Sequence, residues 1–220
     1  MRTVVFDLDG TLADTSADLL ASANACFQGL GLGSLLGPKD AITAGQGGRA
    51  MLRLGFERAG QPWDEVAVDR EYPKLLVAYA AVIDRETTLY PGAVAAVEQL
   101  LAEGFACAVC TNKPEALAEE LLRRLGVRTL FQALVGADTL AVRKPDPLPY
   151  RVAVARAGGQ VARSILVGDT ATDRETARAA GVPSVLVTFG PEGQGVARLE
   201  PEALLDHFSD LPGLAARLII

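Results

Sequence analysis

Two aspartates, Asp7 and Asp9, follow an apolar run near the start of the chain. The run Val4-Val5-Phe6 predicts a buried β-strand, and side chains two residues apart on a strand point to the same side. Two carboxylates at the end of a buried strand are costly unless a cation or a proton offsets their repulsion. The pair therefore indicates a charged functional site at the carboxyl end of this strand.

Polar residues also follow three later apolar segments, and these residues are Thr111-Asn112-Lys113, Lys144-Pro145 and Gly168-Asp169-Thr170-Ala171-Thr172-Asp173. Ligands of an open parallel sheet bind beyond the carboxyl ends of its strands. We therefore expect these segments to converge with Asp7 and Asp9, which would bring together four carboxylates, a hydroxyl and a cation.

Such a set suits phosphoryl transfer to a carboxylate nucleophile. An aspartate that attacks a phosphate ester meets like-charge repulsion, so a divalent ion has to bridge the two anions. Clustered carboxylate oxygens suit Mg²⁺, while a lysine and a hydroxyl neutralise the remaining phosphoryl oxygens. A second carboxylate beside the nucleophile protonates the leaving alcohol and then accepts a proton from water.

The elements that position these residues fall into two groups. Helical periodicity predicts helices over about 14–30, 49–59 and 63–83, the last bent or split at Pro73, with no strand between 15 and 85. From Tyr90 onward, helices alternate with apolar strands over 105–110, 133–135, 164–167 and 184–187. This alternation predicts an α/β fold with a parallel sheet covered on both faces, and residues 15–85 form an inserted helical cap.

The composition excludes several classes of protein. The chain has 220 residues, of which 50% are hydrophobic, and a formal net charge of −6 without any Lys/Arg cluster, which argues against a nucleic-acid partner. No apolar run is long enough for a membrane helix or a signal peptide, so we expect no membrane partner and a cytoplasmic location. Cys107 and Cys110 lie in an apolar strand and are expected to be core residues, and a single histidine leaves zinc without ligands.

Taken in order, the four polar segments resemble the four motifs of the haloacid-dehalogenase-like hydrolases, and within them the phosphoglycolate phosphatase group. The first segment is Asp7-Leu8-Asp9-Gly10-Thr11-Leu12, and the likeness extends over nearly the whole chain. The resemblance implies a Rossmann-like core, residues 1–14 and 86–220, with an all-helical cap domain over residues 15–85. It also implies Mg²⁺ as the cofactor.

The same resemblance implies roles for the four aspartates. Asp7 would be the nucleophile and a Mg²⁺ ligand. Asp9 would be the general acid/base and would offer its backbone carbonyl to the metal. Asp169 would ligate Mg²⁺, and Asp173 would support the metal directly or through water. A purely structural alternative for Asp173 is that it caps the following helix.

The resemblance also implies which groups hold the phosphate. Thr111, together with the Asn112 backbone, would hold the transferring phosphoryl group, and Lys144 would pair with Asp7 and the phosphate. Thr111 is also well placed to cap the helix expected after Pro114, and the two roles are compatible.

The glycine-rich segment Gly45-Gln46-Gly47-Gly48-Arg49 allows two interpretations. It is either a turn within the cap or a substrate loop, in which Gly47, Gly48 and Arg49 contact an anionic leaving group. The sequence does not decide between them.

The function that these features favour is a Mg²⁺-dependent phosphatase for a small phosphorylated metabolite, with 2-phosphoglycolate the leading substrate. Sugar phosphates, nucleotides and pyrophosphate are alternative substrates. A phosphomutase is disfavoured because Ala17-Asp18-Leu19-Leu20 lacks the histidine of such relatives, and a dehalogenase because Asp9 is present. A receiver module would be about half this length, and a silent binding protein would not need every catalytic position filled. The choice between a monomer and a homodimer stays open.

Overall fold

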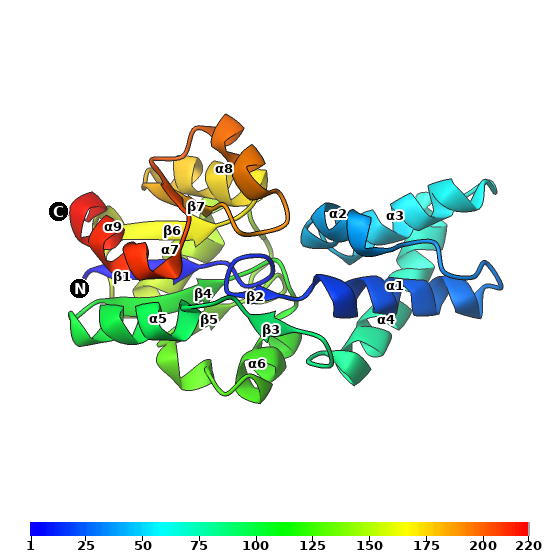
Figure 1. Ribbon diagram of the computed structural model, residues 1–220, viewed down its shortest axis with the longest axis horizontal. Helices are drawn as coiled ribbons and strands as arrows, with labels where there is room; N and C mark the ends of the chain where they lie inside the picture. The colour runs from blue at the N-terminus through cyan, green and yellow to red at the C-terminus, as the bar shows by residue number, and fades with distance from the viewer. Residues whose placement is uncertain (220) are drawn as a thin grey trace. The chain divides into compact units, whose positions relative to one another are not determined.

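A six-stranded parallel sheet forms the main part of the computed structural model, which describes residues 1–219. The strand order is β5-β4-β1-β6-β7-β8 (Figure 1). Strand β1 lies between β4 and β6, so the residues that follow it are flanked by the ends of two other strands. The strands are β1 (Thr3–Phe6), β4 (Ala106–Cys110), β5 (Ala133–Val135), β6 (Ser164–Gly168), β7 (Ser184–Val187) and β8 (Ala203–Leu205).

Helices cover both faces of this sheet, and for that reason every residue of β1, β4 and β6 is buried. On one face, Val5 and Leu166 share a buried cluster with Tyr150 of α7 (Pro147–Arg156) and Ala177 of α8 (Ala171–Ala180). Alternate residues of β4, such as Val109, point to the other face, where α5 (Ala93–Ala102) packs. This arrangement confirms the predicted α/β, Rossmann-like fold.

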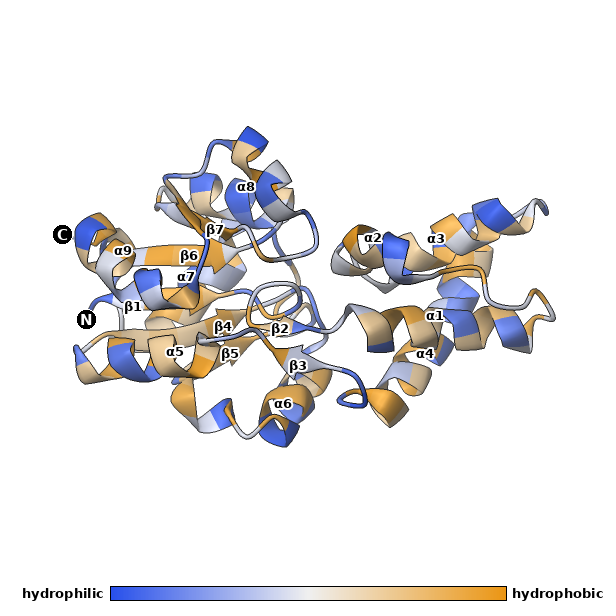
Figure 2. Cartoon of the chain, in the orientation of Figure 1, coloured by the Kyte–Doolittle hydropathy of each residue, from blue (hydrophilic) through white to orange (hydrophobic). Residues whose placement is uncertain are grey.

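The hydropathy of the chain follows this layering. Most residues of strands β6 and β7 are hydrophobic, whereas the helices around them carry both kinds of residue (Figure 2). Among the described residues, no helix combines the length and the hydropathy that a membrane span requires. The sheet unit also contains α6 (Glu115–Arg124), α9 (Leu211–Leu218), η2 (Arg128–Leu130), η3 (Val161–Arg163), η4 (Gly193–Leu199) and η5 (Phe208–Asp210).

The chain forms two compact units, and the sheet unit comprises residues 1–14 and the segment from Leu89 onward. The second unit is Thr15–Thr88, so it ends slightly beyond residue 85, the boundary expected from the sequence. The carboxylate of Asp18 accounts for the difference, because it accepts hydrogen bonds from the backbone N–H groups of Glu86 (3.0 Å) and Thr87 (2.9 Å). Within the sheet unit, the N–H of Tyr90 donates to the carbonyl of Leu12 at 3.0 Å, so the chain returns to the place where it left.

The second unit is helical and has a core of its own. Phe27 meets Phe56 edge to face with 5.6 Å between ring centroids, and Phe56 stacks on Trp63 at 6.2 Å. Two short strands where the chain enters and leaves the unit, β2 (Ala13–Asp14) and β3 (Thr88–Leu89), form a separate two-stranded sheet. The helices are α1 (Ser16–Gly29), η1 (Pro38–Asp40), α2 (Ala41–Gly45), α3 (Gly48–Ala59) and α4 (Glu65–Val82).

Helix α4 runs through Pro73 without being split, contrary to one of the outcomes expected from the sequence. Proline lacks the N–H that would bond to the carbonyl four residues earlier, here that of Asp69. Both Pro73 and Asp69 are exposed, so water can hydrogen-bond to the carbonyl that the proline leaves free. An exposed position therefore lets the helix tolerate the proline.

Candidate active site

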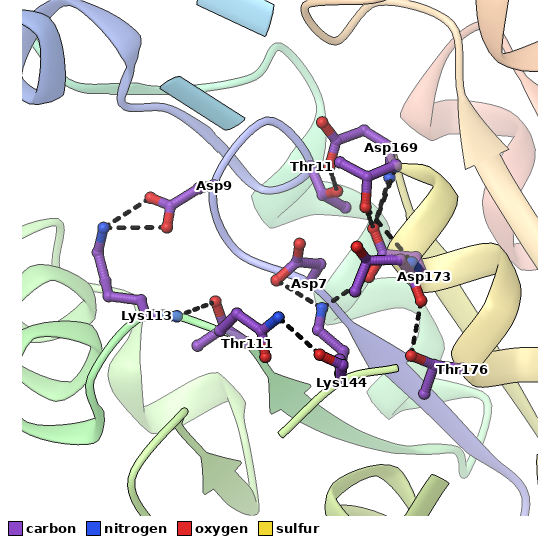
Figure 3. Close-up of polar contacts among 12 residues, drawn as sticks. Asp7, Asp9, Thr11, Thr111, Lys113, Lys144, Asp169, Asp173 and Thr176 are labelled. Atoms are coloured by element: carbon purple, nitrogen blue, oxygen red, sulfur yellow. Dashed lines mark hydrogen bonds and ion pairs between the residues drawn. The ribbon is translucent and has the colours of Figure 1, made fainter. Parts of the chain in front are cut away.

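Lys144 is the cation at the centre of a cluster of buried side chains beyond the carboxyl ends of the strands (Figure 3). Its Nζ lies 3.0 Å from Oδ1 of Asp7 and 2.6 Å from Oδ1 of Asp173. Burial opposes the charge of Lys144, but the carboxylates of Asp173 and Asp7 hold its pKa above the ordinary value. The side chain of Asn112 donates to the backbone carbonyl of Lys144 at 3.0 Å, which fixes the loop that carries the lysine.

Asp7 continues the path of β1, since its N–H donates to the carbonyl of Val167 in β6 at 2.9 Å. Its Oδ1 is buried and accepts no hydrogen bond among the described residues, although Lys144 lies beside it as an ion-pair partner. Burial raises the pKa of Asp7 to about 6, and the charge of Lys144 opposes that rise. The protein thus holds a desolvated carboxylate oxygen that no hydrogen bond occupies, which is the state expected of a nucleophile or a metal ligand.

Asp169 lies in the turn between β6 and α8, and Asp173 lies in the first turn of α8. Oδ1 of Asp169 accepts from the hydroxyl of Thr11 at 2.8 Å, and its pKa is raised by burial and by the charges of Asp173 and Asp7. Thr170 is the N-cap of α8 and forms a capping box with Asp173, so Asp173 itself is not the N-cap. One carboxylate oxygen of Asp173 accepts from the Thr170 hydroxyl at 2.6 Å, while the other faces Lys144.

Three of these carboxylates could hold a metal ion. Asp7, Asp169 and Asp173 each offer a carboxylate oxygen, and these oxygens all lie within 4.8 Å of one another. Three buried carboxylates face one ammonium group, that of Lys144, so negative charge is in excess. A hard divalent cation, which prefers oxygen ligands, fits both the donor set and the unmet charge.

Asp9 is held apart from this cluster by a second lysine. Nζ of Lys113 lies 2.7 Å from Oδ1 and 3.0 Å from Oδ2 of Asp9 (Figure 3). The hydroxyl of Thr111 accepts from the N–H of Lys113 at 3.1 Å, and the helix that follows begins only at Glu115. Thr111 therefore lies outside that helix and is not its N-cap.

The turn between Asp9 and Thr11 depends on a glycine. Gly10 has a φ of 79°, in the left-handed region that residues with a side chain rarely adopt. A Cβ at this position would overlap Oδ2 of Asp169. The glycine therefore allows the β1 turn and the carboxylate of Asp169 to approach closely.

These motifs match a known family over most of the chain. Residues 4–187 match the family described as haloacid dehalogenase-like hydrolase. The chain belongs to this family. It is accordingly an enzyme. The four polar segments that resemble the motifs of this family are the ones that lie together in the structure.

Proteins similar to this chain carry a more specific name. A phosphoglycolate phosphatase of Agrobacterium fabrum is 39% identical over 98% of this chain and 93% of its own length. A phosphoglycolate phosphatase of Mesorhizobium japonicum is also 39% identical, over 98% of this chain and 96% of its own. A crystal structure of a predicted phosphoglycolate phosphatase from Haemophilus somnus superposes with a TM-score of 0.83 at 24% identity, covering 97% of each chain, which shows a shared fold.

The glycine-rich segment of this hydrolase lies in the second unit. Gly47 has a φ of 97° and precedes α3, and a Cβ on Gly48 would lie 3.0 Å from the ring of Tyr72. The guanidinium of Arg49 lies 4.5 Å from the centre of the same ring and pairs with Asp69. The segment is thus a helix-initiating turn, and its role in substrate binding stays a prediction.

Sequence reasoning gave no role to the side chains of Thr11, Asn112 and Lys113, although the structure places all three in the site. Each of the three lies inside or next to a motif, and this position along the chain was the only sign in the sequence of a role in the site. Their partners Asp169, Lys144 and Asp9 come from distant parts of the chain, however, and spacing along the sequence could not reveal these contacts.

Proposed function

We propose that this phosphoric monoester hydrolase acts on a small phosphate monoester, with 2-phosphoglycolate the leading substrate, through a covalent phosphoryl group on Asp7. The observation that carries the proposal is the buried Oδ1 of Asp7. It accepts no hydrogen bond from any residue in the described range 1–219 and lies 3.0 Å from the Lys144 ammonium. The two relatives that are 39% identical and named phosphoglycolate phosphatase support the choice of substrate.

In the first step, an oxygen of the Asp7 carboxylate attacks phosphorus. The bond between phosphorus and the leaving oxygen breaks, and the electron pair passes to that oxygen. Asp9, which enters this step in its protonated form, gives the oxygen a proton and becomes a carboxylate. Phosphoryl transfer demands mainly positioning and charge stabilisation, and Lys144 supplies the positive charge beside the nucleophile. The products are the free alcohol and Asp7 carrying the phosphoryl group.

In the second step, Asp9 removes a proton from a water molecule that attacks the same phosphorus. The bond between phosphorus and the Asp7 oxygen breaks, and Asp7 regains its carboxylate. Asp9 thereby recovers the proton that it gave away, so the enzyme is unchanged after one ester and one water have become alcohol and phosphate.

Mg²⁺ is the cofactor that we assign to the carboxylate cluster. Asp7 and Asp169 would hold it with the backbone carbonyl of Asp9, and Asp173 would support it directly or through water. When bound, the ion would reduce the repulsion between the Asp7 carboxylate and the phosphate. The crowded oxygens of Asp7, Asp169 and Asp173 support this assignment.

Thr111, Asn112 and Lys144 would bind the transferring phosphoryl group. The Thr111 hydroxyl already accepts from the N–H of Lys113, so its own proton remains available for a phosphoryl oxygen. The backbone of Asn112 would hold another phosphoryl oxygen, while its side chain anchors Lys144.

The test is phosphate release by Asp7→Asn with and without Mg²⁺. We expect the wild-type protein to release phosphate only with Mg²⁺, and Asp7→Asn to lose that activity while keeping the wild-type circular dichroism spectrum. Asp210→Asn is the matched control, because Asp210 is exposed and its side chain does not cap the helix that it precedes. Full turnover by Asp7→Asn would overturn the mechanism.

The substrate is tested by kcat/KM over a panel of 2-phosphoglycolate, sugar phosphates, nucleotides and pyrophosphate. We expect 2-phosphoglycolate to give the highest value. A flat profile, or a strong preference for another member of the panel, would reject this substrate and leave the chemistry on Asp7 in place.

A further inference from the structure

Lys113 is a buried lysine whose ammonium group is directed at one carboxylate. Its side chain is 3% exposed, and Nζ contacts both oxygens of Asp9, at 2.7 and 3.0 Å. Lysine is rarely buried unless its charge is paired. The two residues come from different strand ends, so the fold brings them together (Figure 3).

The backbone on both sides of this lysine is fixed. The N–H of Lys113 donates to the hydroxyl of Thr111 at 3.1 Å, and its carbonyl accepts from the N–H of Ala137 at 2.9 Å. Thr111 directly follows β4, and Ala137 lies two residues beyond the end of β5, which pairs with β4. The position of the ammonium group is therefore set by the sheet and not by a mobile surface chain.

The side chain of Asp9 is more accessible than its partner. It is 18% exposed and lies in the turn that leaves β1. Several rotamers are open to an aspartate in such a turn. The two contacts with Lys113 select one of them.

We propose that Lys113 is a positioning residue that holds the carboxylate of Asp9 in place for proton transfer. The inference rests on the proposed function, in which Asp9 gives a proton to the leaving oxygen. A general acid has to lie within hydrogen-bond reach of the atom that it protonates, and a shift of about 1 Å can cost on the order of 100-fold in rate. Lys113 thus acts on the reaction through Asp9, without touching the substrate.

The test compares two leaving groups in Lys113→Met, which keeps the length of the side chain and removes its charge. 2-Phosphoglycolate has a poor, alkoxide leaving group, whereas p-nitrophenolate departs with little need of a proton. The parameter is kcat/KM, which reports the first transfer to Asp7. We expect it to fall about 10- to 100-fold for 2-phosphoglycolate and by less than about threefold for p-nitrophenyl phosphate.

Four further variants sharpen the comparison. Asp9→Asn should show the same selective loss, and Lys113→Met added to it should produce no further selectivity. Lys113→Arg keeps the charge and should recover part of the loss. Lys39→Met removes an exposed lysine and should behave as the wild-type protein.

The outcomes separate this inference from the function on which it rests. Equal losses for both esters in Lys113→Met, or no loss for either, would overturn the positioning role while the wild-type protein remains a phosphatase. Failure of the wild-type protein to release phosphate from either ester would overturn the proposed function and the inference with it. Should Lys113→Met not fold, the ratio of the two esters in Lys113→Arg decides, since a guanidinium group that does not reproduce the ammonium position must also change that ratio.

Discussion

Replacing Lys144 with methionine removes the cation from between two buried carboxylates. Lys144 lies 3.0 Å from Asp7 and 2.6 Å from Asp173, and both acids stay buried in the variant. Breaking a buried ion pair by removing one partner costs about 3–5 kcal/mol of stability. Folded domains are stable by only about 5–15 kcal/mol, so Lys144→Met is expected to weaken the fold severely.

The loss should also depend on pH. The pKa of Asp7 is already raised to about 6, and removal of the ammonium group raises it further. A carboxyl whose folded pKa lies above its unfolded value destabilises the fold increasingly as pH rises through that interval. At about pH 6 protonation of Asp7 relieves part of the cost, so we expect about 3 kcal/mol there and a larger loss at about pH 8.

The assay is urea unfolding in EDTA at these two pH values, with Lys39→Met as the control for loss of an exposed lysine. That control should stay within about 0.5 kcal/mol of the wild-type protein. Adding Asp173→Asn to Lys144→Met should recover part of the stability, because one unpaired charge disappears. A loss below about 1 kcal/mol in Lys144→Met at the higher pH would refute this account of the cluster.

Three other perturbations have defined outcomes. Mg²⁺ at about 100 times its Kd should raise the free energy of unfolding by about 2.7 kcal/mol, measured by urea unfolding with Mg²⁺ and with EDTA. Asp169→Asn should abolish most of that gain. An equal gain in the variant and the wild-type protein would contradict the metal assignment. Gly10→Ala should cost at least about 2 kcal/mol in the same assay and lower kcat/KM at least about tenfold. The reason is that a residue with left-handed backbone gains a Cβ that overlaps Asp169. Wild-type stability and activity in this variant would count against the close approach of Gly10 and Asp169. Arg58 holds the pKa of Asp40 at about 2, so the stabilisation by this pair is present above about pH 4 and lost as pH falls toward 2. Asp40→Asn should therefore cost about 1 kcal/mol at neutral pH, a value reduced for solvent screening of the arginine. The difference from the wild-type protein in urea should shrink as pH falls through about 4 toward 2.

The sheet was predictable because its strands are buried on both faces. Continuous apolar runs such as Val4-Val5-Phe6 and the strand ending at Cys110 mark such strands without help from the rest of the chain. Strand β8 (Ala203–Leu205) escaped prediction because it is short and only Leu205 is buried. Its edge position explains the weak apolar pattern.

The site was predictable only as far as strand ends determine it. That Asp7 and Asp169 meet follows from the rule that parallel strands end at one edge of the sheet. Which lysine pairs with which acid depends on side-chain directions within loops, and no periodicity describes these. The sequence assigned no role to Lys113, and only the folded structure shows its contact with Asp9.

The hydrogen bond from Tyr90 to Leu12 has a consequence for how this enzyme can change over evolutionary time. It joins a residue shortly before the inserted unit to a residue shortly after it, so the backbone of the sheet unit is held together at this point independently of the inserted residues. Residues 15–88 are in this sense a long loop with a core of its own, and such insertions are tolerated where the chain ends lie close together. The unit could be exchanged or redesigned as a module, while the strands that carry Asp7, Lys144 and Asp169 keep their register.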